Sequence, residues 1–125
     1  MAGRRAGRRT ALFLLYQWDV TGQPLTSLYE GEVDEFARGL AEAVSARALE
    51  LDAAITAAAE GWTADRLGAV ERNVLRIGTY ELESGSVPPE VAINEAVELA
   101  KRYATENAAR LVNGILGRIA RERVP

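Results

Sequence analysis

The sequence of 125 residues contains neither cysteine nor histidine. Without cysteine it can form no disulfide, thiolate zinc site or cysteine nucleophile. Without histidine it lacks the usual proton shuttle near neutral pH, the commonest metal ligand and any Ser-His-Asp triad. The acidic residues are scattered without a pair suited to acid–base catalysis, and no glycine-rich loop is present to hold a phosphate. We therefore expect a protein that is not an enzyme and that uses no metal or cofactor.

Long hydrophobic runs are also missing, so the sequence predicts no transmembrane helix and no membrane association. The arginines near the start are not followed by the apolar segment and cleavage signature of a secretory signal. Together with the lack of cysteine, this favours a cytoplasmic protein. The length fits one domain over residues 1–125, and an apolar content of 48% is enough for a core.

Charge is unevenly distributed along the chain. The formal net charge of −3 argues against a general polyanion-binding protein. However, residues 1–29 and 101–125 are each net positive, whereas residues 30–100 are net negative. If the two ends meet in the fold, they form a basic patch on an acidic body. The simpler alternative is that the terminal charges are only solvated.

Apolar residues recur every three to four positions through most of the chain, and no alternating strand pattern is present. The sequence therefore predicts an all-α fold. Expected helices cover residues 4–20, 33–46 and 48–60, a short segment in "GWTADRL", residues 69–84, the segment from Pro88–Pro89 to about 103, and the segment from about 107 to 121. Proline suits a first helical turn because its missing N–H would be unpaired there anyway. Gly61 is expected to cap the third helix, and Thr63 the short one.

Several positions carry individual expectations. Gly78 in mid-helix costs about 1 kcal/mol against alanine, which a close helix crossing would explain. Trp62 is interpreted as a core residue rather than a binding residue. Asn94 and Asn113 lie among apolar residues, where an unpaired amide is costly. We expect them to bond loop backbone, with ligand contact as the alternative.

Two basic segments are candidates for binding an anion. In "GRRAGRRTALFLLYQW" the arginines at 4, 5, 8 and 9 lie on the first turns of a helix, where each can hold a phosphate with two hydrogen bonds. Positive charges are mildly unfavourable at the N-terminus of a helix, and a bound polyanion would offset that energetic cost. The second segment contains Lys101 and Arg102, followed by Asn107 and Arg110. Asn107 could more simply cap the last helix.

Three stretches together resemble the NusB family of bacterial transcription antitermination factors. They are "RRAGRRTALFLLYQWD" near the start, "VERNVLRIGTYEL" in the middle and "VPPEVAINEAVELAKRYATENAARLVNGIL" near the end. The combination of "INEAVELAK" with "VNGIL" is highly specific, whereas the arginine-rich start alone is not. Gly7 in place of the family's usual alanine, Arg9–Thr10 in place of an acidic residue, and Leu111 in place of an aromatic depart from the family pattern.

This resemblance implies one compact NusB-like domain of two small helical bundles, with three helices followed by about four. It implies a protein that binds boxA RNA of ribosomal RNA leaders together with NusE, a small-subunit ribosomal protein, and that joins the RNA polymerase antitermination complex. The RNA-binding residues would be Arg4, Arg5, Arg8, Arg9, Lys101, Arg102 and Asn107. The residues facing NusE would be Tyr16, Glu71, Arg76 and Leu111.

Two other functions remain open on the sequence. One is a protein-only helical adaptor in transcription or ribosome biogenesis, with no RNA affinity of its own. The other is an RNA-modifying enzyme with a NusB-like part, which would need a nucleotide-binding segment that does not follow here. The sequence leaves open a homodimer that covers the arginine face, and also the bases that are read.

Overall fold

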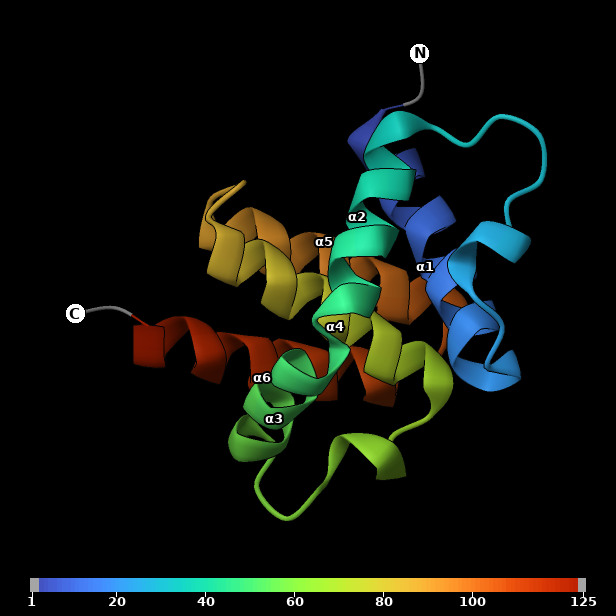
Figure 1. Ribbon diagram of the computed structural model, residues 1–125. Coiled ribbons are helices and arrows are strands. Elements are labelled where there is room, and N and C mark those ends of the chain that lie inside the picture. The colour runs from blue at the N-terminus through green and yellow to red at the C-terminus, as the bar shows by residue number, and fades with distance from the viewer. Residues whose placement is uncertain (1–2, 124–125) are drawn as a thin grey trace.

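The computed structural model describes residues 3–123, and within them the secondary structure is all helical, with loops between the helices and no strand (Figure 1). The helices are α1 (Arg4–Thr21), α2 (Glu35–Ala46), α3 (Ala48–Ala58), α4 (Ala69–Ser84), α5 (Pro89–Tyr103) and α6 (Glu106–Arg123), with two short 3-10 helices, η1 (Leu25–Ser27) and η2 (Ala64–Arg66). The predicted all-α fold is confirmed. None of these helices is long and apolar enough to cross a membrane.

Local signals in the sequence set most helix ends. Helix α1 stops at Gly22, which adopts a left-handed conformation (φ 73°) that glycine tolerates. Helix α2 starts at Asp34, whose carboxylate accepts a hydrogen bond from the backbone N–H of Ala37. Helix α5 starts directly after Pro88. These ends lie close to the predicted ones because they depend on residues near in sequence.

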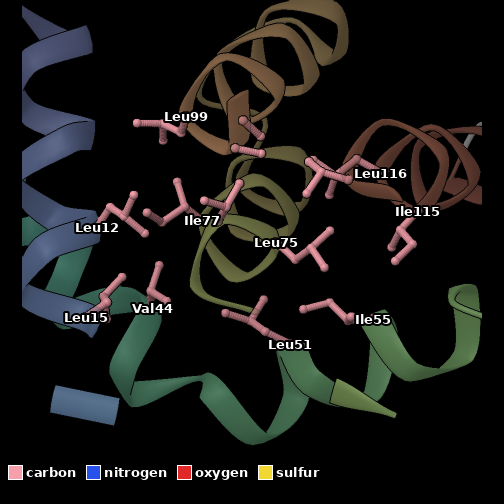
Figure 2. Packing of buried hydrophobic residues seen from close by; sticks show 14 of the residues in the cluster. Leu12, Leu15, Val44, Leu51, Ile55, Leu75, Ile77, Leu99, Ile115 and Leu116 are labelled. Atoms are coloured by element: carbon pink, nitrogen blue, oxygen red, sulfur yellow. The ribbon is translucent and has the colours of Figure 1, made fainter. Parts of the chain in front are cut away.

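Helix α4 is the centre of the fold, and it packs against all five other helices. Its buried side chains meet those of every neighbour in one continuous apolar cluster (Figure 2). Leu12 and Leu15 of α1 and Val44 of α2 lie on one side, whereas Ile55 and Leu116 lie on the other. The first three and the later helices therefore share one core and form a single unit across the described residues.

Gly78 is the point where α4 is crossed most closely. A Cβ atom added there would lie 2.6 Å from Leu116 Cδ1 and 3.4 Å from the Ala96 Cβ. The first distance is shorter than real carbon contacts allow, so only glycine lets α5 and α6 pack at this depth. The close crossing expected at Gly78 is confirmed.

A polar network joins α4 to α1 and α3. Arg76 donates to both carboxylate oxygens of Asp52 at 2.7 Å and to Asp19 at 3.1 Å. Asp19 also accepts from Arg72 at 2.8 Å and from the amide of Asn73 at 2.9 Å. The charges of this partly buried network are paired, so their burial is compensated by directed bonds.

Three sequence expectations about the segment after α3 are wrong. Trp62 is 51% exposed, because the chain leaves α3 through a turn in which Glu60 and Gly61 both have positive φ, and this turn holds the indole outside the core. Helix α3 ends at Ala58, so Gly61 does not cap it. Thr63 makes no side-chain cap to η2.

Asn94 and Asn113 do not tie loops together as expected. Both are exposed, and neither side chain bonds any of residues 3–123. Each lies on the outer face of its helix, where an amide can be hydrated and has no desolvation cost to offset.

Candidate nucleic-acid interface

The two basic segments of the sequence meet at one pocket between α1 and α5. We call this the basic pocket; it has a volume of about 260 Å³ and is lined by Arg5, Arg8, Arg9, Glu95, Glu98, Leu99, Lys101, Arg102 and Tyr103. Five of these side chains are cationic and two are anionic, so the pocket has a positive balance. The condition for a basic patch, that the two basic segments meet in the fold, therefore holds for α1 and for the end of α5.

Arg5 and Glu95 form an ion pair at the rim of this pocket. The Arg5 guanidinium donates to the two Glu95 oxygens at 3.1 and 2.8 Å, although the Arg5 side chain is 78% exposed. These hydrogen bonds lower the pKa of Glu95, against the opposing effect of its burial. The Glu95 carboxylate therefore already lies among the cations of the basic pocket, in a position that a bound phosphate oxygen could occupy.

Arg8 is buried, unlike the other three arginines of α1. Its guanidinium donates to Glu81 of α4 at 2.8 to 3.1 Å, with both side chains at most 5% exposed. A second carboxylate, Glu95, lies 3.7 Å from Arg8. The sequence grouped Arg8 with the arginines expected to bind RNA phosphates, whereas the structure buries its guanidinium against Glu81. Arg8 instead connects α1 to α4 and to Glu95 beneath the pocket.

Gly7 has a packing role that explains its departure from the family pattern. A Cβ atom there would lie 2.5 Å from Phe36 Cδ2, so glycine allows the Phe36 ring to approach α1 closely. The guanidiniums of Arg4 and Arg8 lie over the same ring, at 4.7 and 5.6 Å from its centroid. These distances are within the range of cation–π contacts, which orient Arg4 while leaving it exposed.

The α5 side of the pocket ends in exposed cations and an aromatic ring. Lys101 and Arg102 are both exposed, and Arg102 lies 5.7 Å from the ring centroid of Tyr103. Tyr103 in turn meets Phe13 of α1 edge-on, at 5.1 Å between centroids. Lys101 is only loosely paired with Glu98, at 3.9 Å. This contact leaves the Lys101 ammonium available to another anion.

Asn107 and Arg110 are not part of the basic pocket. Asn107 is exposed on the first turn of α6, and it is not the cap of that helix. Thr105 takes that role, because its hydroxyl accepts from the backbone N–H of Ala108 at 2.9 Å. The structure thus leaves Asn107 free for another contact on the described surface. It does not line the basic pocket, but it follows the pocket's α5 residues after the short turn between α5 and α6.

The four residues predicted to face a protein partner differ in exposure and do not line one common surface in the structure. Tyr16 is exposed, and with Phe13 and Val20 it forms an outward apolar stripe on α1. Glu71 is half-buried, and Leu111 lines a different groove at α6. Arg76 is 6% exposed and held by Asp52 and Asp19, so its placement on a surface was wrong.

Sequence reasoning missed Glu95 and Tyr103 as pocket residues, and it missed Phe13 and Val20 beside Tyr16. The spacing of three and four residues from Phe13 to Tyr16 to Val20 does place all three on one helix face. Only the packing of the neighbouring helices shows that this face is left uncovered.

Comparison with known proteins agrees with this geometry. The NusB family matches residues 5–121. The transcription antitermination protein NusB of Rubrobacter xylanophilus is 44% identical over 120 residues, covering 90% of this chain and 86% of that protein. The solved structure of T. maritima NusB superposes with a TM-score of 0.87 at 37% identity, covering 99% of this chain and 94% of that one. A chain in a crystal structure of antitermination factors NusB and NusE with double-stranded RNA superposes with a TM-score of 0.84 at 33% identity, covering 95% and 96%.

A family match over nearly the whole chain, identity above 40% to a curated relative and the same fold agree with one another. The chain therefore belongs to the NusB family of transcription antitermination proteins.

Proposed function

We propose that this protein binds boxA RNA of ribosomal RNA leaders through the basic pocket. The observation that carries the proposal is that Arg5, Arg9, Lys101 and Arg102, from segments about 90 residues apart, line one pocket. Arginine and lysine bind phosphate oxygens, and clustering them on an otherwise acidic chain localises the attraction. The solved complex of NusB, NusE and double-stranded RNA supports an RNA ligand for this fold.

Within that pocket the arginines have different tasks. Arg9, Lys101 and Arg102 contact RNA phosphates, and Arg4 and Asn107 extend the contact at either side. Arg9 is the least committed cation of α1, since it makes neither an ion pair nor a cation–π contact with residues 3–123, whereas Arg4 lies over the Phe36 ring. Arg5 takes part once a phosphate replaces Glu95. Arg8 acts indirectly, because its bonds to Glu81 hold the first turns of α1 in place.

NusE is the proposed protein partner, and the complex acts with RNA polymerase in the cytoplasm. The exposed stripe of Phe13, Tyr16 and Val20 is the proposed contact, because three apolar side chains in a row on one helix can fit a partner's groove. Glu71 and Leu111 stay secondary candidates. Phe13 touches Tyr103 of the basic pocket, so RNA and NusE would lie side by side.

Fluorescence anisotropy of labelled boxA RNA tests the proposal, with and without NusE and across a salt series. We expect tighter binding with NusE, preference over a scrambled RNA and a steep loss of affinity with salt. Arg9→Ala should weaken binding, whereas Arg38→Ala, an exposed arginine elsewhere, should not. Equal affinity for both RNAs and no gain from NusE would contradict the proposal.

A protein-only adaptor is the second candidate, and the uncovered Phe13–Tyr16–Val20 stripe favours it. In that case the NusE complex forms but binds RNA no better than NusE alone. Tyr16→Ala would then abolish the complex, and Arg9→Ala would change nothing in the anisotropy titration.

A further inference from the structure

A second groove with a cationic and aromatic lining lies between the end of α3 and the outer face of α6. We call it the α6 groove; Trp62, Arg110, Leu111, Gly114, Arg118 and Arg121 are among its lining residues. Figure 1 shows α3 and α6, the helices that border this groove, packed together on the side of the molecule away from the first turns of α1. None of its residues lines the basic pocket.

The charges of the α6 groove select an anionic ligand. Its three arginines face one lining carboxylate, that of Glu60, which pairs with Arg118. Arg118 is also bonded to Glu122 at 3.0 Å. Arg110 and Arg121 make no ion pair with any residue in 3–123, so both guanidiniums keep their full hydrogen-bonding capacity. The Arg121 side chain lies over Gly117: a Cβ atom added to that glycine would be 3.3 Å from the Nη1 of Arg121.

Trp62 supplies a flat apolar surface beside those cations. The indole is 51% exposed and lines the groove together with the apolar residues Leu111 and Ile115, so a large part of the ring is accessible to a ligand. Aromatic rings next to arginines are the combination with which proteins bind single-stranded nucleic acid, because bases stack on the ring while phosphates meet the cations.

The position of α6 makes the groove reachable from the basic pocket. Helix α5 ends at Tyr103 and α6 begins at Glu106. The exposed cations Lys101 and Arg102 therefore come just before the turn between the two helices, and the exposed Arg110 comes just after it. From Arg110 to Arg121 the helix advances about 16 Å along its axis. A strand that leaves the basic pocket can therefore continue onto α6.

We propose that the α6 groove is a second RNA site, in which a single-stranded segment flanking the RNA held in the basic pocket stacks a base on Trp62 and places phosphates on Arg110 and Arg121. This inference rests on the proposed RNA binding, and it adds a path for the strand across a second face of the protein. The groove then contributes only when the RNA is long enough to reach it.

The test compares a short boxA RNA with the same RNA extended at each end in turn by about ten unstructured nucleotides, which is within the range of known single-strand sites. One of the two extensions should tighten binding to the unaltered protein by at least about fivefold, the lower range for one stacked base. Trp62→Ala and Arg110→Glu should remove this gain while leaving affinity for the short RNA unchanged. Arg38→Glu, an exposed charge reversal outside both sites, should keep the gain.

A second measurement uses the intrinsic fluorescence of Trp62. Trp18→Phe leaves Trp62 as the single tryptophan and retains an aromatic ring beside Arg76. The extended RNA should quench this fluorescence, and the short RNA should not. The slope of log affinity against log salt should also fall by about one in Arg110→Glu with the extended RNA.

The outcomes separate the two proposals. If the short RNA is bound and depends on Arg9, but neither extension adds affinity or quenches Trp62, the second site is wrong and RNA binding by the basic pocket stands. An acidic protein segment as the true occupant would give this same absence of an extension effect. If the short RNA is not bound at all, the proposed function itself fails.

Discussion

Arg8 on α1 and Glu81 on α4 are 73 positions apart in sequence and form a buried ion pair with three hydrogen bonds of 2.8 to 3.1 Å. Glu81 ends a row with Val74 and Ile77 that is otherwise apolar and faces the core. A carboxylate in this place would be strongly unfavourable alone, so α1 and α4 each supply the charge that the other requires. The pair therefore fixes where the first turns of α1 lie.

Glu81→Gln should destabilise the fold. The variant keeps the shape of the side chain but leaves the buried Arg8 charge with only Glu95, 3.7 Å away and shared with Arg5, as a counter-ion. Breaking a buried pair costs about 3 to 5 kcal/mol, and the remaining contact with Glu95 should place this variant near the lower value. Urea unfolding followed by circular dichroism measures the loss. The double variant Arg8→Met with Glu81→Leu is the control, and it should recover most of that stability because no charge is left buried. A Glu81→Gln protein as stable as the unaltered one would show that the pair does not anchor α1.

Gly78→Ala should destabilise the protein, although alanine is the better helix former. The gain in helix propensity is about 1 kcal/mol, whereas overpacking a filled core typically costs about 1 to 3 kcal/mol. Leu116 is fully buried, so its methyl group 2.6 Å from the new carbon has little room to move. Gly39→Ala on the exposed face of α2 meets nothing within 4 Å and should be stabilising. Thermal melting of both variants should shift in opposite directions.

Glu95→Gln should increase RNA affinity. RNA must displace the Glu95 carboxylate from Arg5 before that arginine can bind a phosphate, and exposed ion pairs of this kind are worth about 0 to 1 kcal/mol. We expect up to about a fivefold tightening in the anisotropy titration, with the effect largest at low salt. Glu32→Gln has the same charge change outside the basic pocket and should have little effect. Weaker binding by Glu95→Gln would mean that Glu95 orients Arg5 for RNA rather than competing with it.

Acid should weaken the link between α1 and α4 through Asp19. Burial alone would raise the pKa of Asp19, but the hydrogen bonds from Arg72 and Asn73, together with the charges of Arg76 and Arg72, outweigh burial and lower the pKa below its ordinary value of 3.8. A carboxyl with a lower pKa in the folded state stabilises the fold at pH values above its unfolded pKa. That contribution is lost as pH falls from near 3.8 through the lower folded value.

The measurement is the unfolding free energy of the unaltered protein and of Asp19→Asn from about pH 6 down to about pH 3. The unaltered protein should be more stable at the upper end, and the difference should shrink toward the acidic end. A difference that stays constant over this range would mean that the Asp19 carboxylate is not the source of the stabilisation.

Much of the fold could be predicted from the sequence, because helix formation depends on local spacing. The apolar periodicity predicted the ends of α1 and α4 to within one or two residues, and the Pro88–Pro89 pair marked the start of α5. The glycine in mid-α4 correctly indicated a close crossing. The α3 exit was predicted less well. Trp62 was expected in the core, but the positive φ of Glu60, which no residue preference encodes, turns the chain so that Trp62 lies outside.

The candidate site was predictable in its composition but not in its geometry. The sequence by itself determined that two basic segments flank an acidic middle and that the chain carries the NusB motifs. It could not separate Arg8 from Arg5 and Arg9, because all three are arginines on the same exposed-looking turns. Periodicity states which residues of one helix share a face, but not which helix covers that face.

Only the tertiary structure decided that Glu81 and Glu95 meet these arginines, through contacts 73 and 90 positions apart. It likewise decided that Arg76 is held by Asp52 and Asp19, whereas Arg110 and Arg121 have no such partners within residues 3–123. The physical reason is that the exposure and pairing of a charge depend on how helices cross, and crossings are set by the whole core rather than by any one segment.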